Sequence, residues 1–206
     1  MFNNTIIKNI FNSISAGIVI AIGGSVFLAC ASEQQRYLGA ILFSVALLCI
    51  CLKGYALFTG KVGFIIESHT RKDFTVLLTS LLGNLIGTII CGYAIRYTFP
   101  VFADYAFTLC IAKLDQQILQ ALIRSIFCGI LMYLAVSIYR DKKSLVGILF
   151  CVPVFILSGF EHSIANMFYF ATSGIVSWSA FLYIMIVVTG NAIGGMLLPV
   201  LTKTSK

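Results

Sequence analysis

The sequence predicts an all-helical integral membrane protein with six transmembrane segments. Hydrophobic residues make up 60% of the 206 positions, only 10% are charged, and the mean hydropathy is +1.02. A soluble domain would carry roughly a quarter charged residues. The apolar residues form long unbroken runs, as a membrane-spanning helix of about 20 residues requires. They do not alternate with polar residues, as the strands of a membrane barrel would.

Two of the six apolar runs contain residues that a continuous lipid-facing helix would not tolerate. The second run includes Lys53 and Gly60, and the fifth includes Pro153, Glu161 and His162. Backbone can be irregular at membrane depth only where protein or a water-filled cavity surrounds it. We therefore expect the second and fifth helices to be broken. The six spans are expected near 10–31, 38–67, 75–96, 119–139, 145–170 and 179–200.

A repeated motif divides the chain into two halves. GNLIGT at 83–88 recurs as GNAIGG at 190–195, each in the span that follows a broken one. One such motif alone would be explained by helix packing through small residues, but two copies in register favour an internal repeat. Three spans per half make residues 101–206 an inverted copy of residues 1–100, within a single transmembrane domain over 1–206. Paired interrupted helices in inverted repeats indicate a transport site near the membrane midplane.

The basic residues of the connections predict the orientation. Nine lie on one side of the expected topology and four on the other, which places both termini in the cytoplasm. The nine are Lys8, Lys61, Arg71, Lys72, Arg140, Lys142, Lys143, Lys203 and Lys206, and the four are Arg36, Arg96, Lys113 and Arg124. This bias accounts for the net charge of +7 without a nucleic-acid partner. The seven cysteines form no CxxC pair, so neither a disulfide framework nor a metal site is expected.

One acidic residue and one histidine stand side by side within an apolar region. Residues 144–160 before Glu161 and His162 carry no charge, and neither do residues 163–202 after them. A charge at the bilayer centre costs from about 3 to more than 10 kcal/mol, so such residues mark ion or proton pathways by default. Histidine is also the side chain that titrates near neutral pH, at about 6.5. The alternative is a buried histidine that bonds only to helix backbone.

Over nearly its whole length the chain resembles the formate/nitrite transporter family. The most specific motif is GFEHSIANMF at 159–168. The resemblance extends to SISAGIVIAIGG at 13–24, LFTG at 57–60, GNLIG at 83–87, QALIRSIFCGILMYLAV at 120–136 and GNAIGG at 190–195. It implies an aquaporin-like fold, a homopentamer with one pore in each protomer, and passage of formate, nitrite, hydrosulfide or, in some members, lactate.

The resemblance also implies roles for individual residues. His162 would be the central pore histidine, and Thr59 the threonine on the facing broken helix that hydrogen-bonds it. Further pore positions are Leu57 and Phe58 at the break of the second span, Leu47 and Phe155 as a cytoplasmic constriction, Phe43 and Phe160 as constriction or pore-lining residues, and Lys113 near the outer vestibule. The broken helices would be supported by Glu161, Asn166, Gly60, Asn84 and Asn191.

The chain departs from the family pattern at two places. Where the fourth span of the family usually ends its motif in asparagine, this chain has Gly129. Lys53 within the second span has no counterpart in the family. Both departures leave the fold expectation unchanged and bear on the choice of substrate.

A mechanism is expected from these residues. Lys113, with Lys53 as a second candidate, would draw the anion in by electrostatic focusing. His162 would donate a proton or a strong hydrogen bond, and the neutral acid would cross apolar gates. Half-helix N-termini would offer backbone N–H groups to the anion. We expect formate as substrate, protons and the lipid bilayer as further partners, no cofactor, and a bacterial inner membrane location.

Other functions are weighed against this one. A neutral-solute pore of aquaporin type would carry NPA motifs, which the sequence lacks. An intramembrane enzyme could use the Glu161–His162 pair for acid–base work, but neither an HExxH nor a G-x-S-x-G motif is present. A structural or regulatory subunit would need no central histidine. We therefore expect a transporter, with no catalytic residues.

Overall fold

The computed structural model describes residues 2–68 and 70–203, and all regular secondary structure in these ranges is helical. The elements are α1 (Phe2–Ser32), α2 (Arg36–Lys53), α3 (Phe58–Lys61), the 3-10 helix η1 (Val62–Phe64), α4 (Ile65–Ser68), α5 (Arg71–Thr98), α6 (Pro100–Leu114), α7 (Ile118–Lys142), α8 (Val146–Leu157), α9 (Ser163–Ser173) and α10 (Trp178–Lys203). Within the described ranges, five helices are long and apolar enough to cross a membrane: α1, α2, α5, α7 and α10.

The outer faces of the long helices are apolar. On α5, large side chains at a spacing of four residues are exposed: Leu78 by 59%, Leu82 by 51%, Ile86 by 45% and Ile90 by 59%. Such a stripe would be unfavourable in water, and it suits contact with lipid or with another membrane helix. The chain is therefore a multi-pass membrane protein.

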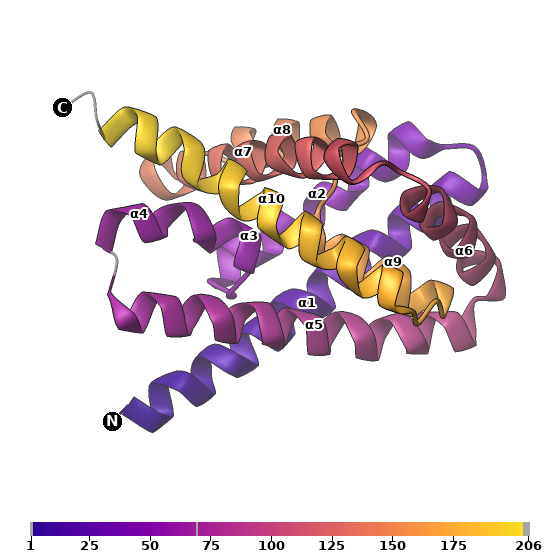
Figure 1. Cartoon of the computed structure of the whole chain (residues 1–206), viewed down its shortest axis with the longest axis horizontal. Coiled ribbons are helices and arrows are strands. Elements are labelled where there is room, and N and C mark those ends of the chain that lie inside the picture. The colour runs from indigo at the N-terminus through magenta and orange to yellow at the C-terminus, as the bar shows by residue number, and fades with distance from the viewer. Residues whose placement is uncertain (1, 69, 204–206) are drawn as a thin grey trace.

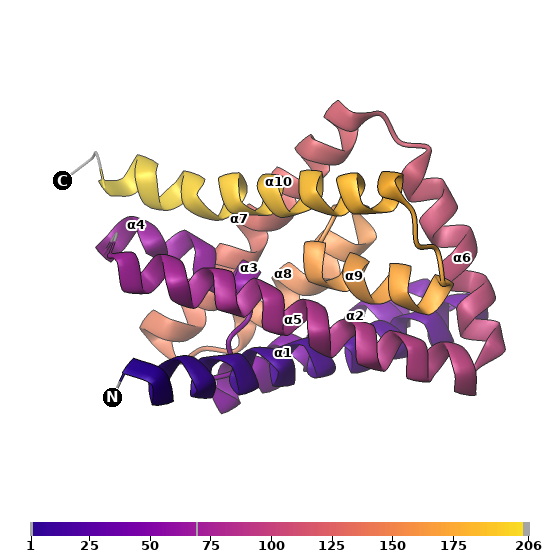
Figure 2. The same cartoon turned by 60° about the horizontal axis from the view of Figure 1, so that its bottom comes forward.

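The helices are arranged around two short interior ones. Figures 1 and 2 show α3 and α9 lying between the long helices, with the start of α1 and the end of α10 at one end of the molecule. Every residue of α9 is buried, and so are Phe58, Thr59 and Gly60 of α3. The short helices thus lie in the interior, where the chain can interrupt its hydrogen bonding without exposing backbone to lipid.

Each short interior helix follows a break at a glycine with positive φ. Helix α2 ends at Lys53, Gly54 adopts φ +70°, and α3 begins at Phe58. Helix α8 ends at Leu157, Gly159 also has φ +70°, and α9 begins three residues after Phe160. Glycine takes this backbone conformation without steric cost, so it ends a helix cleanly.

A buried asparagine of α5 holds the first break. The Asn84 side-chain amide donates to the carbonyls of Ser13 (2.7 Å) and Ala56 (2.9 Å). Its Oδ1 accepts from the backbone N–H of Phe58, the first residue of α3, at 2.9 Å. One fully buried side chain therefore ties α1, the broken segment and the start of α3 together.

An equivalent asparagine of α10 holds the second break. The Asn191 amide donates to the carbonyls of Ser125 and Glu161, both at 2.8 Å. Its Oδ1 accepts at 2.8 Å from the N–H of Ser163, the first residue of α9. In each break the asparagine binds one carbonyl and the N–H of the residue two positions later. The two asparagines therefore make the same set of hydrogen bonds at the two breaks.

Small residues bring the supporting helices close enough for these bonds. A Cβ added at Gly17 of α1 would collide with the backbone of Asn84, and one added at Gly129 of α7 would collide with the backbone of Asn191. Gly129 therefore allows α7 and α10 to meet just as Gly17 allows α1 and α5 to meet. The residue that departs from the family pattern thus has a packing role.

Helix α6 is the element that the sequence analysis missed. Residues 97–118 were left as a connection, yet Pro100–Leu114 is helical and lies at the end of the molecule opposite the end of α10 (Figures 1 and 2). Its proline stands at the first helical position, where the absent N–H costs nothing. The helix is too short to cross a membrane, and this length explains why the search for spans passed over it.

Candidate functional site

The centre of the site is a hydrogen bond between the two short interior helices. Thr59 Oγ1 of α3 lies 2.9 Å from Nε2 of His162, the residue that caps the N-terminus of α9. Both residues are buried, with exposed fractions of 1% and 3%. The sequence analysis expected this pairing by resemblance, and the structure places the two side chains together.

A second bond determines which nitrogen of the imidazole carries the proton. His162 Nδ1 accepts from the backbone N–H of Ala165 at 3.1 Å. A nitrogen that accepts a hydrogen bond has no proton, so the neutral ring carries its proton on Nε2. Nε2–H then donates to Thr59 Oγ1, and the threonine hydroxyl proton is left to donate elsewhere. The imidazole in this arrangement is neutral.

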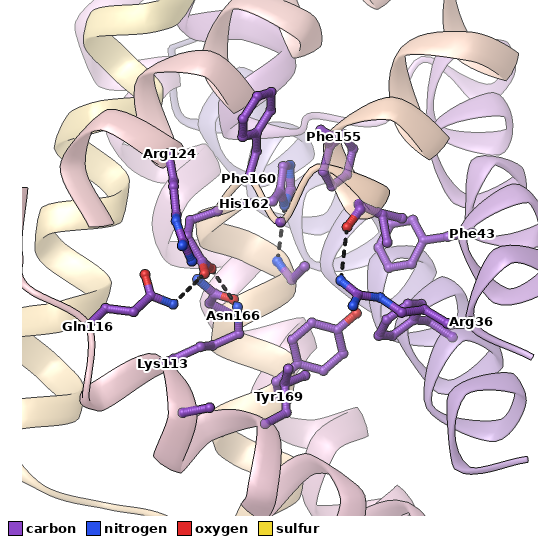
Figure 3. Close-up of a pocket in the computed structure, with 17 residues that line it drawn as sticks. Arg36, Phe43, Lys113, Gln116, Arg124, Phe155, Phe160, His162, Asn166 and Tyr169 are labelled. Carbon is purple, nitrogen blue, oxygen red and sulfur yellow. Dashed lines mark hydrogen bonds and ion pairs between the residues drawn. The ribbon is translucent and has the colours of Figure 1, made fainter. Parts of the chain in front are cut away.

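Aromatic side chains close one side of the imidazole. The ring of Phe155 stacks on His162, with centroids 5.6 Å apart and planes 19° apart. Phe43 meets Phe155 edge-on at 6.3 Å, and both phenylalanines are at most 3% exposed. Phe160 stacks on Phe127 at 5.3 Å. The histidine therefore lies beside an aromatic barrier formed by the buried rings of Phe43 and Phe155 (Figure 3).

A cavity of about 170 Å³ leads to this barrier, and we call it the His162 cavity. Apart from small residues and aliphatic ones, it is lined by aromatic, charged and amide side chains. These are Phe27, Arg36, Phe43, Lys113, Gln116, Arg124, Phe155, Phe160, Glu161, His162, Asn166 and Tyr169. Its volume suits an anion of a few atoms with some water, since a single water needs about 10–15 Å³ of such space.

A second cavity, of about 280 Å³, lies on other residues, and we call it the Leu57 cavity. Leu47, Leu57 and Gly60 line it, but neither His162 nor Phe155 does. Both leucines are only 1% exposed, so they form an apolar group at its inner end. The remaining lining residues are Ile50, Cys51, Gly54, Tyr55, Lys61, Phe64, Val136, Tyr139, Arg140 and Lys143.

Leu47 and Phe155, which the resemblance groups in one constriction, line different cavities. Phe155 contacts Phe43 and lines the His162 cavity, whereas Leu47 lines the other cavity with Leu57. Phe43 and Leu47 are one turn apart on α2, about 6 Å along its axis. The same helix face therefore contributes to two levels, which a linear motif does not distinguish.

The Glu161 carboxylate is held by side chains. Its Oε2 lies 2.5 Å from Lys113 Nζ and accepts from Asn166 Nδ2 at 2.9 Å, and its Oε1 accepts from Gln116 Nε2 at 3.1 Å. Two of the three partners are amides, Gln116 in the loop between α6 and α7 and Asn166 in α9, and the third is the Lys113 ammonium. Helix α6, which the sequence analysis missed, thus supplies the charged partner, Lys113.

This network changes the role expected of Lys113. The side chains of Lys113 and Glu161 are 11% and 4% exposed, and each offsets the charge of the other. A neutralised pair contributes little to the attraction of an anion from outside the cavity. Lys53, the second candidate for this attraction, is exposed at the end of α2 and lines neither of the two cavities.

Some lining residues of the His162 cavity were not singled out from the sequence. Arg36 and Arg124 were counted only as loop charges, and Gln116 and Tyr169 were not considered. For Arg36, Gln116 and Arg124 the signal is weak, because each stands far along the chain from the GFEHSIANMF motif that marks the site, whereas Tyr169 directly follows that motif and was passed over as one more apolar residue. Only the fold brings the two arginines and Gln116 beside it.

The half-helix N-termini are less available than expected. The N–H groups of Phe58 and Ser163 bond Asn84 and Asn191, and that of Ala165 bonds the His162 ring. These donors are therefore taken by protein groups. The expectation that they solvate a passing anion does not hold for these three.

A comparison with protein families identifies the chain. The family model described as formate/nitrite transporter matches residues 2–204. The chain belongs to the formate/nitrite transporter family. It is 31% identical over 194 residues to the uncharacterized transporter YwcJ of Bacillus subtilis, covering 84% of this chain and 76% of that one.

Other members of the family are more distant. The nitrite transporter NirC of Escherichia coli is 29% identical over 156 residues, which cover 69% of this chain and 58% of NirC. Formate-nitrite transporter 2 of Toxoplasma gondii is 28% identical over 193 residues, which cover 83% of this chain and 42% of that protein. The chain therefore matches only about half the length of these two relatives.

Solved structures agree with the family. A pentameric formate channel with formate bound superposes with a TM-score of 0.81 at 25% identity, covering 98% of both chains. An FNT family ion channel superposes with a TM-score of 0.80 at 21% identity, over 95% of this chain and 88% of that one, and shows the shared fold. Members of the formate/nitrite transporter family are membrane channels and transporters, not enzymes.

Proposed function

We propose that this protein is a transmembrane channel for a small monovalent weak-acid anion. Formate is the favoured substrate, and nitrite and hydrosulfide are the other candidates. The observation that carries the proposal is the Thr59–His162 bond, which joins two buried half-helices beside the aromatic barrier of the His162 cavity.

The proposed architecture is a single transmembrane domain of six spans in two inverted repeats. The second span would comprise α2 to α4 and the fifth α8 and α9, each interrupted at a glycine with positive φ. The matching bonds of Asn84 and Asn191 support the repeat. The formate channel of the same fold is pentameric, so we propose a homopentamer here, in a bacterial inner membrane with both termini in the cytoplasm.

To pass the aromatic barrier, the substrate must either be protonated or lose the water around its charge, and both cost free energy. A carboxylate of pKa about 3.9 needs roughly 4 kcal/mol to be protonated at pH 7. Crossing as a bare anion requires protein groups to replace its water. Three half-helix N–H groups near the site are already bonded to protein, so these three do not replace that water. We propose that the substrate crosses in its neutral form.

His162 would assist as a neutral hydrogen-bond donor. Its Nδ1 is committed to the N–H of Ala165, so only Nε2–H is directed at the Thr59 hydroxyl. A substrate oxygen arriving at this pair could accept from the threonine hydroxyl while Thr59 accepts from the ring. The substrate would take its proton from the water of the His162 cavity, and the pair would bind the neutral form, with Phe43 and Phe155 on one side and Leu47 and Leu57 on the other. Substrate and proton would separate again beyond the leucines.

The test is uptake into proteoliposomes that contain a pH-sensitive dye. Formate, nitrite, hydrosulfide and chloride are compared for wild type, His162→Phe and the control Thr189→Val, which alters an exposed side chain of α10. We expect internal acidification above the leak of empty vesicles for one weak acid, loss in His162→Phe, and no change in the control. Wild-type uptake no faster than leak would contradict the channel function. Passage of uncharged solutes alone would indicate a neutral-solute pore.

A further inference from the structure

The charges around the His162 cavity do not balance. Its lining includes three basic residues, Arg36, Lys113 and Arg124, and one acidic residue, Glu161. Lys113 and Glu161 form an ion pair at 2.5 Å with both side chains largely buried. The positive charge that remains in this cavity therefore belongs to the two arginines.

Neither guanidinium has an acidic partner in the part of the chain that the structure describes. Arg36 donates to the carbonyl of Ile156 at 3.4 Å, and no ion pair involves either arginine within residues 2–68 and 70–203. Both residues are exposed. In Figure 3 they project toward the cavity from different sides, Arg36 from α2 and Arg124 from α7. Their charges are thus available to a solute.

Guanidinium groups suit one shape of anion in particular. A planar guanidinium presents parallel N–H groups that match two oxygens of one anion, whereas an ammonium acts as a point charge. Formate and nitrite both offer two oxygens on one atom. Chloride and hydrosulfide offer a single centre. Two unpaired arginines in a cavity with aromatic walls would therefore concentrate anions in general and retain two-oxygen anions longest.

We propose that Arg36 and Arg124, and not Lys113, capture the anion at the His162 cavity. The inference rests on the proposed function of this same pore. It assigns capture and the preference for two-oxygen anions to the arginines. Lys113 becomes a positioning residue that holds Glu161 beside the break before α9.

The test compares charge removal with charge conservation at both positions. Formate uptake is measured against formate concentration, at low and high salt, for Arg36→Gln, Arg124→Gln, the double variant and the two Arg→Lys variants. Lys53→Gln is the matched control, since it removes a positive charge that lines neither cavity. We expect the half-saturating concentration to rise about threefold for each Gln variant and about tenfold for the double, from the loss of one or two nearby charges.

Further readouts separate capture from a structural role. The differences should shrink at high salt, where charges at this exposed site are screened. Lysine should restore the half-saturating formate concentration but not the preference for formate over chloride. A lower maximal rate with an unchanged half-saturating concentration would overturn the capture role, and so would an equal rise in Lys53→Gln. If the wild type takes up formate and the double variant behaves like the wild type, the capture role of the arginines is overturned but the proposed function is not. Absence of wild-type uptake would overturn the proposed function and the capture role together.

Discussion

His162 and Thr59 are 103 residues apart in the chain, yet their side chains meet at 2.9 Å in the interior. Each stands at the start of a short buried helix that follows a break. The ring is oriented from both ends, by the N–H of Ala165 on Nδ1 and by the Thr59 hydroxyl on Nε2. Thr59 and the Ala165 N–H together therefore fix the orientation of the imidazole ring.

Replacing Thr59 by valine should slow transport. The substitution keeps the shape but leaves Nε2–H unpaired, which costs about 1–3 kcal/mol when the group is buried. We expect the formate uptake rate to fall at least about tenfold, corresponding to about 1.4 kcal/mol in the barrier. Thr59→Ser keeps the hydroxyl and should retain most of the rate. Equal rates in the valine and serine variants would show that the hydroxyl has no part in transport.

The asparagines of α5 and α10 should contribute equally to stability. Asn84→Leu and Asn191→Leu each remove three buried hydrogen bonds and leave one carbonyl and one N–H of a break unpaired, since the carbonyls of Ser13 and Ser125 keep their bonds within α1 and α7. Each unpaired buried group costs about 1–3 kcal/mol, so both variants should unfold well below the wild-type temperature in detergent. Thr189→Val, which changes an exposed side chain two residues before Asn191, is the control. A large loss in only one leucine variant would contradict the equivalence of the two halves.

The Lys113–Glu161 pair should show strong coupling in a double-mutant cycle. Glu161→Gln leaves a largely buried ammonium without its partner, and breaking a buried pair from one side costs about 3–5 kcal/mol. Lys113→Met leaves the carboxylate with only Gln116 and Asn166. The double variant should be more stable than either single one, as measured by thermal unfolding in detergent. Additive losses would mean that the pair adds nothing beyond its separate hydrogen bonds.

Gly129 and Gly159 are required for different reasons, close helix packing at Gly129 and a positive φ at Gly159. A methyl group at Gly129 would collide with the Asn191 backbone, whereas Gly159 has open space and a φ of +70°. Gly159→Ala should therefore cost only about 1–2 kcal/mol from backbone strain. Gly129→Ala should separate α7 from α10 and lower the yield of assembled protein, measured by size-exclusion chromatography. A wild-type profile for Gly129→Ala would show that α7 can shift without loss.

Sequence alone was sufficient for the membrane class and for the family. Long apolar runs and the GFEHSIANMF motif are continuous in the sequence, so they can be recognised without knowledge of the fold. Two partners of Glu161 were not predictable, because Lys113 and Gln116 lie 48 and 45 positions away, at the end of a helix that was not foreseen and in the loop after it. The grouping of Phe43 with Phe155 likewise depends on which level of α2 faces α8, and this follows from packing between helices.

The pH dependence of uptake should distinguish neutral passage from passage of the bare anion. A carboxyl group with a pKa of about 3.9 is almost fully ionised above pH 5, and its neutral fraction rises about tenfold for each unit of decrease from pH 7 to pH 5. If the neutral acid crosses the barrier of Phe43 and Phe155, the formate uptake rate should rise with falling external pH at constant total formate. Bare-anion passage would leave the rate nearly constant, since the anion concentration hardly changes.

The measurement is the initial uptake rate at pH 7, 6 and 5, after subtraction of the leak through empty vesicles. A permanently charged anion such as chloride serves as the control, because its rate should not respond to substrate protonation. His162→Phe should lose the protein-dependent part of the formate rate at every pH, because protonation in bulk water does not replace the bond at Thr59. A flat profile for formate in the wild type would mean that the anion crosses in ionised form. The pore would then have to supply donors other than the N–H groups already bonded to Asn84, Asn191 and His162.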